Sequence, residues 1–180
     1  MEAHQTSPLT AATAGPLQGA TVLPCLTVRT ARWRDQFAIC GIECACFGRI
    51  RLPFGLWTRV GGSGVEAWIA EAGVEAADGK QSGLRAAGYL IAYQWPLDGR
   101  PLTYIGGVGV KPAYRQQGIG EQLTRKVLDA GDTVWLHVRD HNRSAIQLYD
   151  KLGFHVAKQL SHFYSNGDNA LVMLRDMARH

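Results

Sequence analysis

Two closely spaced glycines, Gly118 and Gly120, mark the part of this sequence whose residue types are best suited to bind an anion. Residues 102–110 before them are rich in Val and Ile, as in a β-strand. The apolar residues beside and after them recur at the four-residue spacing of a helix: Ile119, Leu123 and Val127. Glycine lets a ligand approach the backbone closely, and the first N–H groups of a helix lie unpaired at the positive end of its dipole. Together these features predict a site for a phosphate or pyrophosphate group.

Two common phosphate-binding motifs do not fit this stretch. A P-loop requires Gly-Lys followed by Ser or Thr, which does not follow the glycines, and the dinucleotide fingerprint requires a third glycine where Leu123 stands. What remains is the hexapeptide RQQGIG at 115–120, with Val110-Lys111-Pro112 before it. An ordinary glycine-rich turn is the alternative, although such a turn does not need Arg115 together with two spaced glycines.

The hexapeptide Arg115-Gln116-Gln117-Gly118-Ile119-Gly120 resembles the acetyl-CoA signature of the GNAT superfamily of N-acetyltransferases, Gln/Arg-x-x-Gly-x-Gly/Ala after a β-strand. A second stretch, LHVRDHNRSAIQLYDKLGF at 136–154, is similar to a second block of that superfamily. The segment FYSNGDNALVM at 163–173 resembles the ending of N-terminal protein acetyltransferases, including bacterial enzymes that acetylate a ribosomal protein. The resemblance covers residues 102–174 well and residues 26–95 only through the order of their elements.

The resemblance implies a single α/β domain of GNAT type. Its central sheet would be mixed, mostly antiparallel and six- to seven-stranded, splayed between the fourth and fifth strands and flanked by helices. We expect residues 26–180 to form this domain and residues 1–25, rich in Ala, Thr, Gly and Pro, to form a tail or an extended arm.

The residue patterns agree with that order of elements. Strands are predicted to start at residue 26 and to span 66–72, 87–94, 102–110, 133–139, 154–160 and 170–174, with helices over 33–47, after Gly118 and after the N-cap Asn142. The first helix has Trp33, Phe37, Cys40, Ile42 and Cys44 on one broad face. Residues 73–85 are expected to form a polar hairpin loop. Residues 48–60 form either a binding loop leading into a short helix or a segment whose Phe54 and Trp57 only fill the core.

The resemblance also implies which residues bind acetyl-CoA. The backbone N–H groups of residues 116–120 would bind the pyrophosphate, with Arg115 adding charge. The pantetheine arm would pair beside Val108 and Val110, and a backbone N–H near Val108 would stabilise an oxyanion. The full set of cofactor-binding candidates is Val108, Gly109, Val110, Arg115, Gln116, Gln117, Gly118, Ile119, Gly120, Asn142, Ala145 and Tyr149.

Three side chains are candidates for moving protons. His137 would accept the proton of the acceptor amine through water with the help of Tyr104. Some eukaryotic and archaeal-type relatives carry His and Tyr at these places, whereas the ribosomal-protein branch has glutamate in place of His137. An imidazole pKa of about 6.5 is close to that of an α-amine, about 7.7–8.0, and about four units below that of lysine, about 10.4. Tyr149, by its match to the second block, would protonate the departing sulfur. Each of the three could instead be a packing residue.

Composition limits the other possibilities. The 180 residues carry a net charge of +4 and lack a Lys/Arg-rich run, so nucleic acid is not an expected partner. There is no apolar stretch of about 20 residues and no secretory signal, so we expect no membrane association and a cytoplasmic location. Four cysteines, Cys25, Cys40, Cys44 and Cys46, lack the spacing of a zinc site; we expect no metal, and a buried helix in which cysteine acts as a small hydrophobe.

The sequence therefore favours an acetyl-CoA-dependent N-acetyltransferase. The preferred acceptor is the N-terminal α-amine of a protein or peptide, attacking the thioester directly in a ternary complex. A small-molecule amine, such as a polyamine, an amino acid or an aminoglycoside, is the alternative acceptor. A CoA-binding regulatory module without turnover is a further alternative, and the chain could be a monomer or a homodimer.

Overall fold

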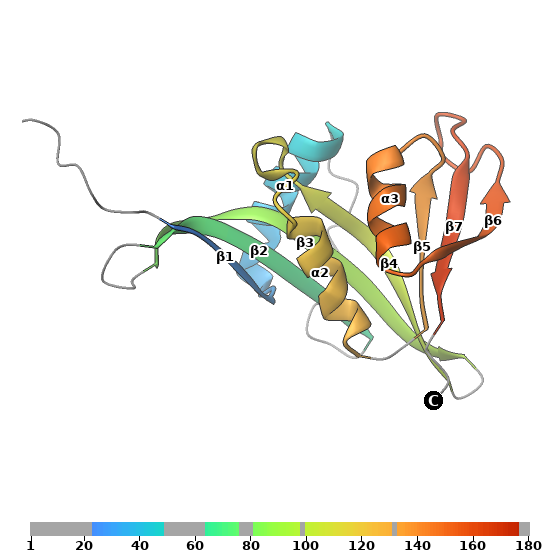
Figure 1. The fold of residues 1–180 in the computed structure, drawn as a ribbon, viewed down its shortest axis with the longest axis horizontal. Helices are drawn as coiled ribbons and strands as arrows, with labels where there is room; N and C mark the ends of the chain where they lie inside the picture. The colour runs from blue at the N-terminus through green and yellow to red at the C-terminus, as the bar shows by residue number, and fades with distance from the viewer. Residues whose placement is uncertain (1–22, 49–63, 76–80, 98–99, 131–132, 177–180) are drawn as a thin grey trace, which may run out of the picture.

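The computed structural model describes residues 23–48, 64–75, 81–97, 100–130 and 133–176. Within these ranges seven strands form one sheet in the order β1-β2-β3-β4-β5-β7-β6 (Figure 1). The strands are β1 (Leu23–Thr30), β2 (Val65–Glu75), β3 (Gln81–Leu97), β4 (Arg100–Val110), β5 (Thr133–Arg139), β6 (His155–Leu160) and β7 (Ala170–Arg175). Every neighbouring pair is antiparallel except β4 and β5, which run parallel. The predicted mixed, mostly antiparallel sheet is confirmed.

The sheet is splayed between β4 and β5, as predicted. The two strands pair only from Leu102 opposite Thr133 to Ile105 opposite Leu136. Beyond this point β4 runs on to Val110 and β5 to Arg139, and the register gives no further pairs between them. One edge of the last residues of β4 is therefore not occupied by β5.

A β-bulge in β4 lies at the point where the strands separate. Gly107 lies opposite Ile91 of β3, whereas Ile105 lies opposite Ala92, so Gly106 is an inserted residue. A bulge bends its strand and increases the local twist, which turns the end of β4 away from β5. The glycines of the sequence LTYIGGVGV thus lie where the strand changes direction, and they also leave the backbone there without side chains.

In the described part of the chain, three α-helices cover the two faces of the sheet. The helices α2 (Ile119–Leu128) and α3 (Arg143–Lys151) lie in front of it in Figure 1, and α1 (Gln36–Phe47) lies behind it. Two apolar clusters follow from this layering. The larger one joins α2 and α3 to the sheet through residues such as Leu123, Tyr149 and Leu136, and the smaller one joins α1 to the other face through Ile39, Ile42 and Tyr89.

The predicted buried face of the first helix is correct only in part. Trp33 and Phe37 are 67% and 72% exposed, and Cys44 is exposed, whereas the residues that face the sheet are Ile39, Ile42 and Glu43. One reason is a tertiary contact: the Tyr89 hydroxyl of β3 donates a hydrogen bond to Glu43 Oε1, so the carboxyl group of Glu43, which was not part of the predicted face, is accommodated against the sheet. The buried helix of small cysteines is thus only partly confirmed.

The predicted loop over 73–85 is also shorter than expected. β2 continues to Glu75 and β3 begins at Gln81, with Glu75 lying opposite Gln81 and Val74 opposite Ser82. Backbone pairing with a neighbouring strand extends both strands through residues whose polar side chains favour a loop. Residues 1–22 and 49–63, which include most of the expected N-terminal tail and most of the expected binding loop, lie outside the described residues.

The helices show no membrane span. None of those in the described part of the chain is both long enough and apolar enough to cross a bilayer. The same described residues contain no group of three His, Cys, Asp or Glu side chains arranged to hold a metal ion.

Candidate active site

The loop between β4 and α2 leaves the first N–H groups of α2 open. It consists of a 3-10 turn, Pro112–Tyr114, followed by Gln116 and Gly118 with φ of 61° and 75°. Among the described residues no side chain caps the N-terminus of α2. The open N–H groups and the positive end of the helix dipole form the predicted anion-binding geometry.

Glycine is needed at the two positions of the motif for different structural reasons. Gly118 has a positive φ, and a Cβ built on it would meet no described atom within 4 Å, so the conformation alone requires glycine. Gly120 packs closely: its Cβ would lie 3.2 Å from Leu148 Cδ2 of α3. Gly118 therefore sets the turn, and Gly120 sets how closely α2 approaches α3.

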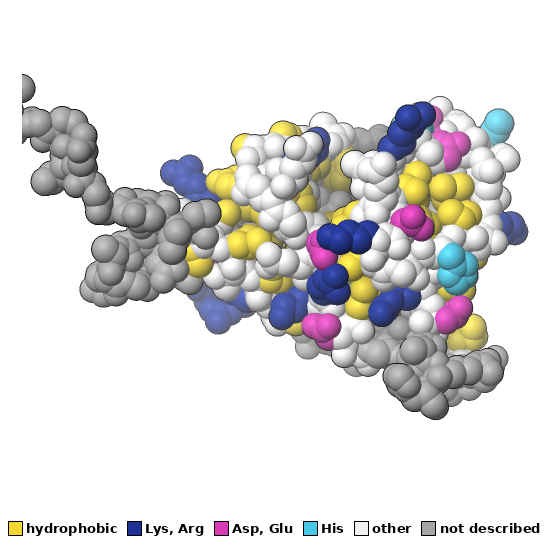
Figure 2. All heavy atoms as spheres, viewed as in Figure 1, with side chains coloured by type: hydrophobic (Ala, Val, Ile, Leu, Met, Phe, Trp, Pro, Cys, Tyr) yellow, Lys and Arg dark blue, Asp and Glu magenta, His cyan; other side chains and the backbone are white. Residues whose placement is uncertain are grey.

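Positive charge surrounds this loop. Arg115 is exposed, and its Nε donates to the Val110 carbonyl over 3.1 Å, which holds the guanidinium beside the end of β4. Figure 2 shows further Lys and Arg side chains on the face that α2 and α3 form. The one acidic residue in the first turn of α2, Glu121, is paired with Lys151 of α3 and with Arg125. These hydrogen bonds, that of Lys151 first, lower the pKa of Glu121 and neutralise its charge near the anion site.

Tyr104 and His137 are brought together by the parallel pairing of β4 and β5. The Tyr104 hydroxyl lies 3.2 Å from His137 Nδ1, within hydrogen-bond distance. Tyr104 is opposite Trp135 in the register, and His137 lies one residue beyond Leu136, the last residue of β5 that pairs with β4. The pair therefore lies where the two strands separate.

The environment of His137 favours its neutral form. The side chain is half-buried, and desolvation by this burial lowers the pKa of His137 from its ordinary value of 6.5. The Phe163 ring stacks on the imidazole with a centroid distance of 4.4 Å and an interplanar angle of 20°. A neutral imidazole has one nitrogen free to accept a proton.

An aromatic row extends from this pair across the sheet. Tyr93 of β3 lies next to Tyr104, whose ring is 4.5 Å from that of Trp135. Trp135 in turn meets the His137 ring edge-on at 5.2 Å. Because side chains alternate along a strand, Trp135 and His137 share one face of β5, but nothing local in the sequence indicated that Tyr93 and Phe163 would join them.

The loop that carries Phe163, residues 161–169 between β6 and β7, is held by the end of β5. Arg139 donates to the Asp168 carboxylate and to Asn166 Oδ1, and its guanidinium lies 4.0 Å from the centroid of the Tyr164 ring. The Tyr164 N–H closes the loop by donating to the Asp168 carbonyl over 3.1 Å. These contacts fix the loop that places Phe163 against the imidazole.

Tyr149 lies on the other face of the sheet from His137. It is 7% exposed, packs edge-on against Phe154 at 5.5 Å, and belongs to the apolar cluster that also contains Leu136 and Val138. His137 alternates with these two residues along β5, so it faces the opposite side of the sheet. Burial, and then the charge of Tyr164, raise the pKa of Tyr149, which keeps its hydroxyl protonated.

Asn142 caps α3 as predicted. Its Oδ1 accepts hydrogen bonds from the Ala145 N–H over 3.3 Å and from the Ser144 hydroxyl over 3.2 Å. Ala145 is packed against the larger apolar cluster. Both residues stand at the N-terminus of the helix that carries Tyr149.

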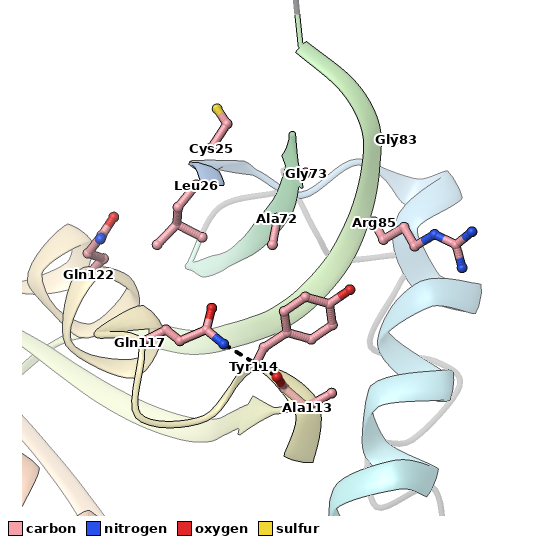
Figure 3. Close-up of a pocket in the computed structure, with 10 residues that line it drawn as sticks. All are labelled: Cys25, Leu26, Ala72, Gly73, Gly83, Arg85, Ala113, Tyr114, Gln117 and Gln122. Atoms are coloured by element: carbon pink, nitrogen blue, oxygen red, sulfur yellow. Dashed lines mark hydrogen bonds between the residues drawn. The ribbon is translucent and has the colours of Figure 1, made fainter. Parts of the chain in front are cut away.

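A separate hollow lies on the other side of the β4–α2 loop. Its volume is about 690 Å³, and its lining includes Tyr114 and Gln117 of the loop, Gln122 of α2, and Cys25 and Arg85 of the strands (Figure 3). Figure 3 shows the Tyr114 ring directed toward β3. His137, Tyr104 and Tyr149 are not among the described residues that line this hollow, but Gln117 is, so the hollow adjoins the loop predicted to bind the pyrophosphate.

Comparison with known proteins identifies the family. The sequence model described as "Acetyltransferase (GNAT) family" matches residues 57–154, which is more than half of the chain. This chain belongs to the GNAT acetyltransferase family. The predicted superfamily and its fold are thereby confirmed.

The GNAT chain is similar to several N-terminal acetyltransferases. It is 38% identical over 101 residues to the N-alpha-acetyltransferase RimI of Mycobacterium tuberculosis, a match that covers 52% of this chain and 64% of that protein. It is 36% identical over 103 residues to the N-terminal acetyltransferase A complex catalytic subunit ard1 of Schizosaccharomyces pombe, covering 52% and 58%. In both matches the chain spans less than two thirds of the relative's length.

Solved structures share the GNAT fold over most of the chain. Arabidopsis thaliana NAA60 in complex with acetyl-CoA superposes with a TM-score of 0.70 at 22% identity, covering 84% of this chain and 98% of that one. The ribosomal-protein-S18-alanine N-acetyltransferase of Escherichia coli gives a TM-score of 0.69 at 24% identity, covering 87% and 96%.

Proposed function

We propose that this GNAT protein is an acetyl-CoA-dependent N-acetyltransferase that acetylates the N-terminal α-amine of a protein or peptide, with direct attack on the thioester in a ternary complex. The observation that carries the proposal is the Tyr104–His137 pair, hydrogen-bonded where β4 and β5 separate. The similarity to proteins named as N-alpha-acetyltransferases supports this choice of acceptor.

The residues around the splay fit acetyl-CoA, which supplies an activated acetyl thioester when bound. The open N–H groups of residues 116–120 would bind the pyrophosphate, with Arg115 beside them. The edge of β4 at Val108, Gly109 and Val110, which β5 leaves vacant, would pair with the pantetheine arm. A backbone N–H near Val108 would bind the carbonyl oxygen. Asn142 and Ala145, at the start of α3, would also contact the cofactor.

His137 would take the proton of the acceptor amine, directly or through one water. If Nδ1–H donates to the Tyr104 hydroxyl oxygen, Nε2 is left as the acceptor, and Tyr104 then fixes the tautomer of the base. Because burial lowers its pKa, His137 is neutral near pH 7 and ready to accept a proton. The aromatic row beside it surrounds the amine with apolar surface and limits access of water.

Tyr149 would donate the proton that the departing sulfur needs. Its raised pKa keeps the hydroxyl protonated throughout the physiological range, and it approaches from the face opposite His137. The acid and the base would therefore act from the two sides of the splay, with the cofactor edge of β4 between them.

Release of CoA thiol from acetyl-CoA tests this function. Peptides that differ only in their first residue should be acetylated at different rates, and blocking the N-terminus of the best peptide should abolish the reaction. Spermine and small amino compounds serve as competing acceptors. Turnover with these amines and not with peptides would contradict the proposed acceptor. Acetyl-CoA binding without turnover of any acceptor would contradict catalysis.

A further inference from the structure

A carboxylic acid is enclosed between α1 and the sheet. Glu43 is 1% exposed, and its Oε1 accepts a hydrogen bond from the hydroxyl of Tyr89, which is fully buried on β3. Burial of a carboxyl group costs free energy unless hydrogen bonds compensate for the lost water. A polar pair in this position therefore needs a reason beyond filling the core, and the proposed proton transfers do not use it.

The ring of Tyr89 lies directly on the bare backbone of β4. A Cβ built on Gly109 would be 2.6 Å from Tyr89 Cε1 and 3.3 Å from Ile42 Cγ2, and one built on Gly107 would be 3.3 Å from the Tyr89 hydroxyl oxygen. Real Cβ atoms essentially never approach another heavy atom within 3.0 Å. Tyr89 thus excludes a side chain at Gly109 and leaves little room for one at Gly107, because its ring takes the space that side chains of β4 would fill.

These glycines belong to the part of β4 that β5 does not support. They lie beyond Ile105, the last β4 residue that pairs with β5, and beyond the bulge at Gly106. In this stretch β4 is held by its pairing with β3 on one edge and by the Tyr89 ring on the face toward α1. A second polar contact comes from the same helix, since Cys46 Sγ donates to the Val110 carbonyl over 3.2 Å.

We propose that Glu43 and Tyr89 are positioning residues for the acetyl-CoA site. The buried hydrogen bond holds the Tyr89 ring across Gly107 and Gly109, and the ring fixes the backbone of β4 where it separates from β5. Neither side chain touches the cofactor. The proposal rests on the proposed function, because the backbone being fixed is the edge assigned to the pantetheine arm.

Three variants test the pair through the dissociation constant of acetyl-CoA, measured by calorimetry well below the unfolding temperature. Tyr89→Phe keeps the ring and removes only the hydroxyl, and Glu43→Ala removes the acceptor; each should weaken acetyl-CoA binding by about tenfold, as expected for loss of a buried hydrogen bond. Glu43→Gln retains an oxygen that accepts from Tyr89 and should bind acetyl-CoA within about threefold of the wild type. The KM for the acceptor should change little in all three.

A matched control separates positioning from general loss of stability. Asp35→Asn weakens an ion pair at the start of the same helix, on the side of β1 and β2, and should lower the unfolding temperature without changing acetyl-CoA binding. Unchanged binding in folded Tyr89→Phe, or equal losses in Glu43→Gln and Glu43→Ala, would overturn the proposal. If Tyr89→Phe does not fold, the comparison of the two Glu43 variants decides. A wild-type protein that does not bind acetyl-CoA would instead refute the proposed function.

Discussion

Replacement of His137 by glutamine tests the proposed base most directly. The introduced amide would still be able to hydrogen-bond to the Tyr104 hydroxyl, which lies 3.2 Å from His137 Nδ1, but it has no nitrogen that titrates. The substitution therefore removes the proton acceptor while keeping a polar side chain in the same place. A variant that also lost the hydrogen bond, such as alanine, would confuse the two effects.

The expected magnitudes differ for the two members of the pair. A positioned general base contributes about 10²- to 10⁴-fold, so His137→Gln should lower kcat by that range. Tyr104→Phe removes the hydrogen bond to His137, a contact that contributes about 0.5–1.5 kcal/mol, and should lower kcat by only about 2- to 13-fold. The structure therefore predicts that His137→Gln lowers kcat more than Tyr104→Phe does.

The dependence of kcat on pH provides the assay. Because burial lowers the pKa of His137, its neutral form persists to a lower pH than that of a free imidazole. With saturating peptide, kcat should rise with pH through a midpoint below about 6.5 and then level off. In His137→Gln this step should be absent. A His137→Gln enzyme with kcat within about tenfold of the wild type, or with the same pH step, would refute His137 as the base.

Three further predictions concern other parts of the chain. Arg29 donates to both oxygens of Asp35 and of Glu71, so Arg29→Ala should cost about 2–3 kcal/mol after allowance for its partial exposure, measured by chemical denaturation. The hydrogen bond from Arg29 lowers the pKa of Asp35 in the folded state. This stabilisation is therefore present above the unfolded pKa of about 3.9 and is lost as the pH falls through the lower folded value. A difference in unfolding free energy between the variant and the wild type that persisted at lower pH would contradict the assignment. Gly118→Ala should raise the KM for acetyl-CoA several-fold, since its φ of 75° costs an alanine about 1–2 kcal/mol, whereas an unchanged KM would show that the turn does not shape the anion site. Asp168→Asn should weaken the hold of Arg139 on the β6–β7 loop and lower kcat/KM for the peptide while acetyl-CoA binding stays unchanged; a loss of acetyl-CoA binding would count against this separation of the two sites.

Much of the fold could be predicted because its signals are local. The alternating pattern of residues 133–139 gave the bounds of β5 as observed, and the N-cap Asn142 marked the start of α3. The glycines at 118 and 120 predicted the turn before α2. In each case the residue types that favour an element also lie within it, so no knowledge of distant partners was needed.

What could not be predicted depends on contacts between residues far apart in the sequence. The buried face of α1 was predicted only in part, because the burial of Glu43 involves a hydrogen bond from Tyr89, 46 residues away. The candidate base and its tyrosine were found through a family resemblance, whereas the stacking of Phe163 on His137 emerges only when β7 pairs with β5. The bulge at Gly106 likewise depends on the register with β3.

The short pairing between β4 and β5 also bears on how the chain folds. The four strands β1 to β4 pair only with their neighbours in sequence, and β5 to β7 form a second group joined to the first by the pairs from Leu102 to Ile105. During synthesis the first group can therefore assemble as a meander before the second group leaves the ribosome. Until then the β4 edge and the apolar face later covered by α2 and α3 are open to other chains, so aggregation should be greatest for nascent chains halted between β4 and β5.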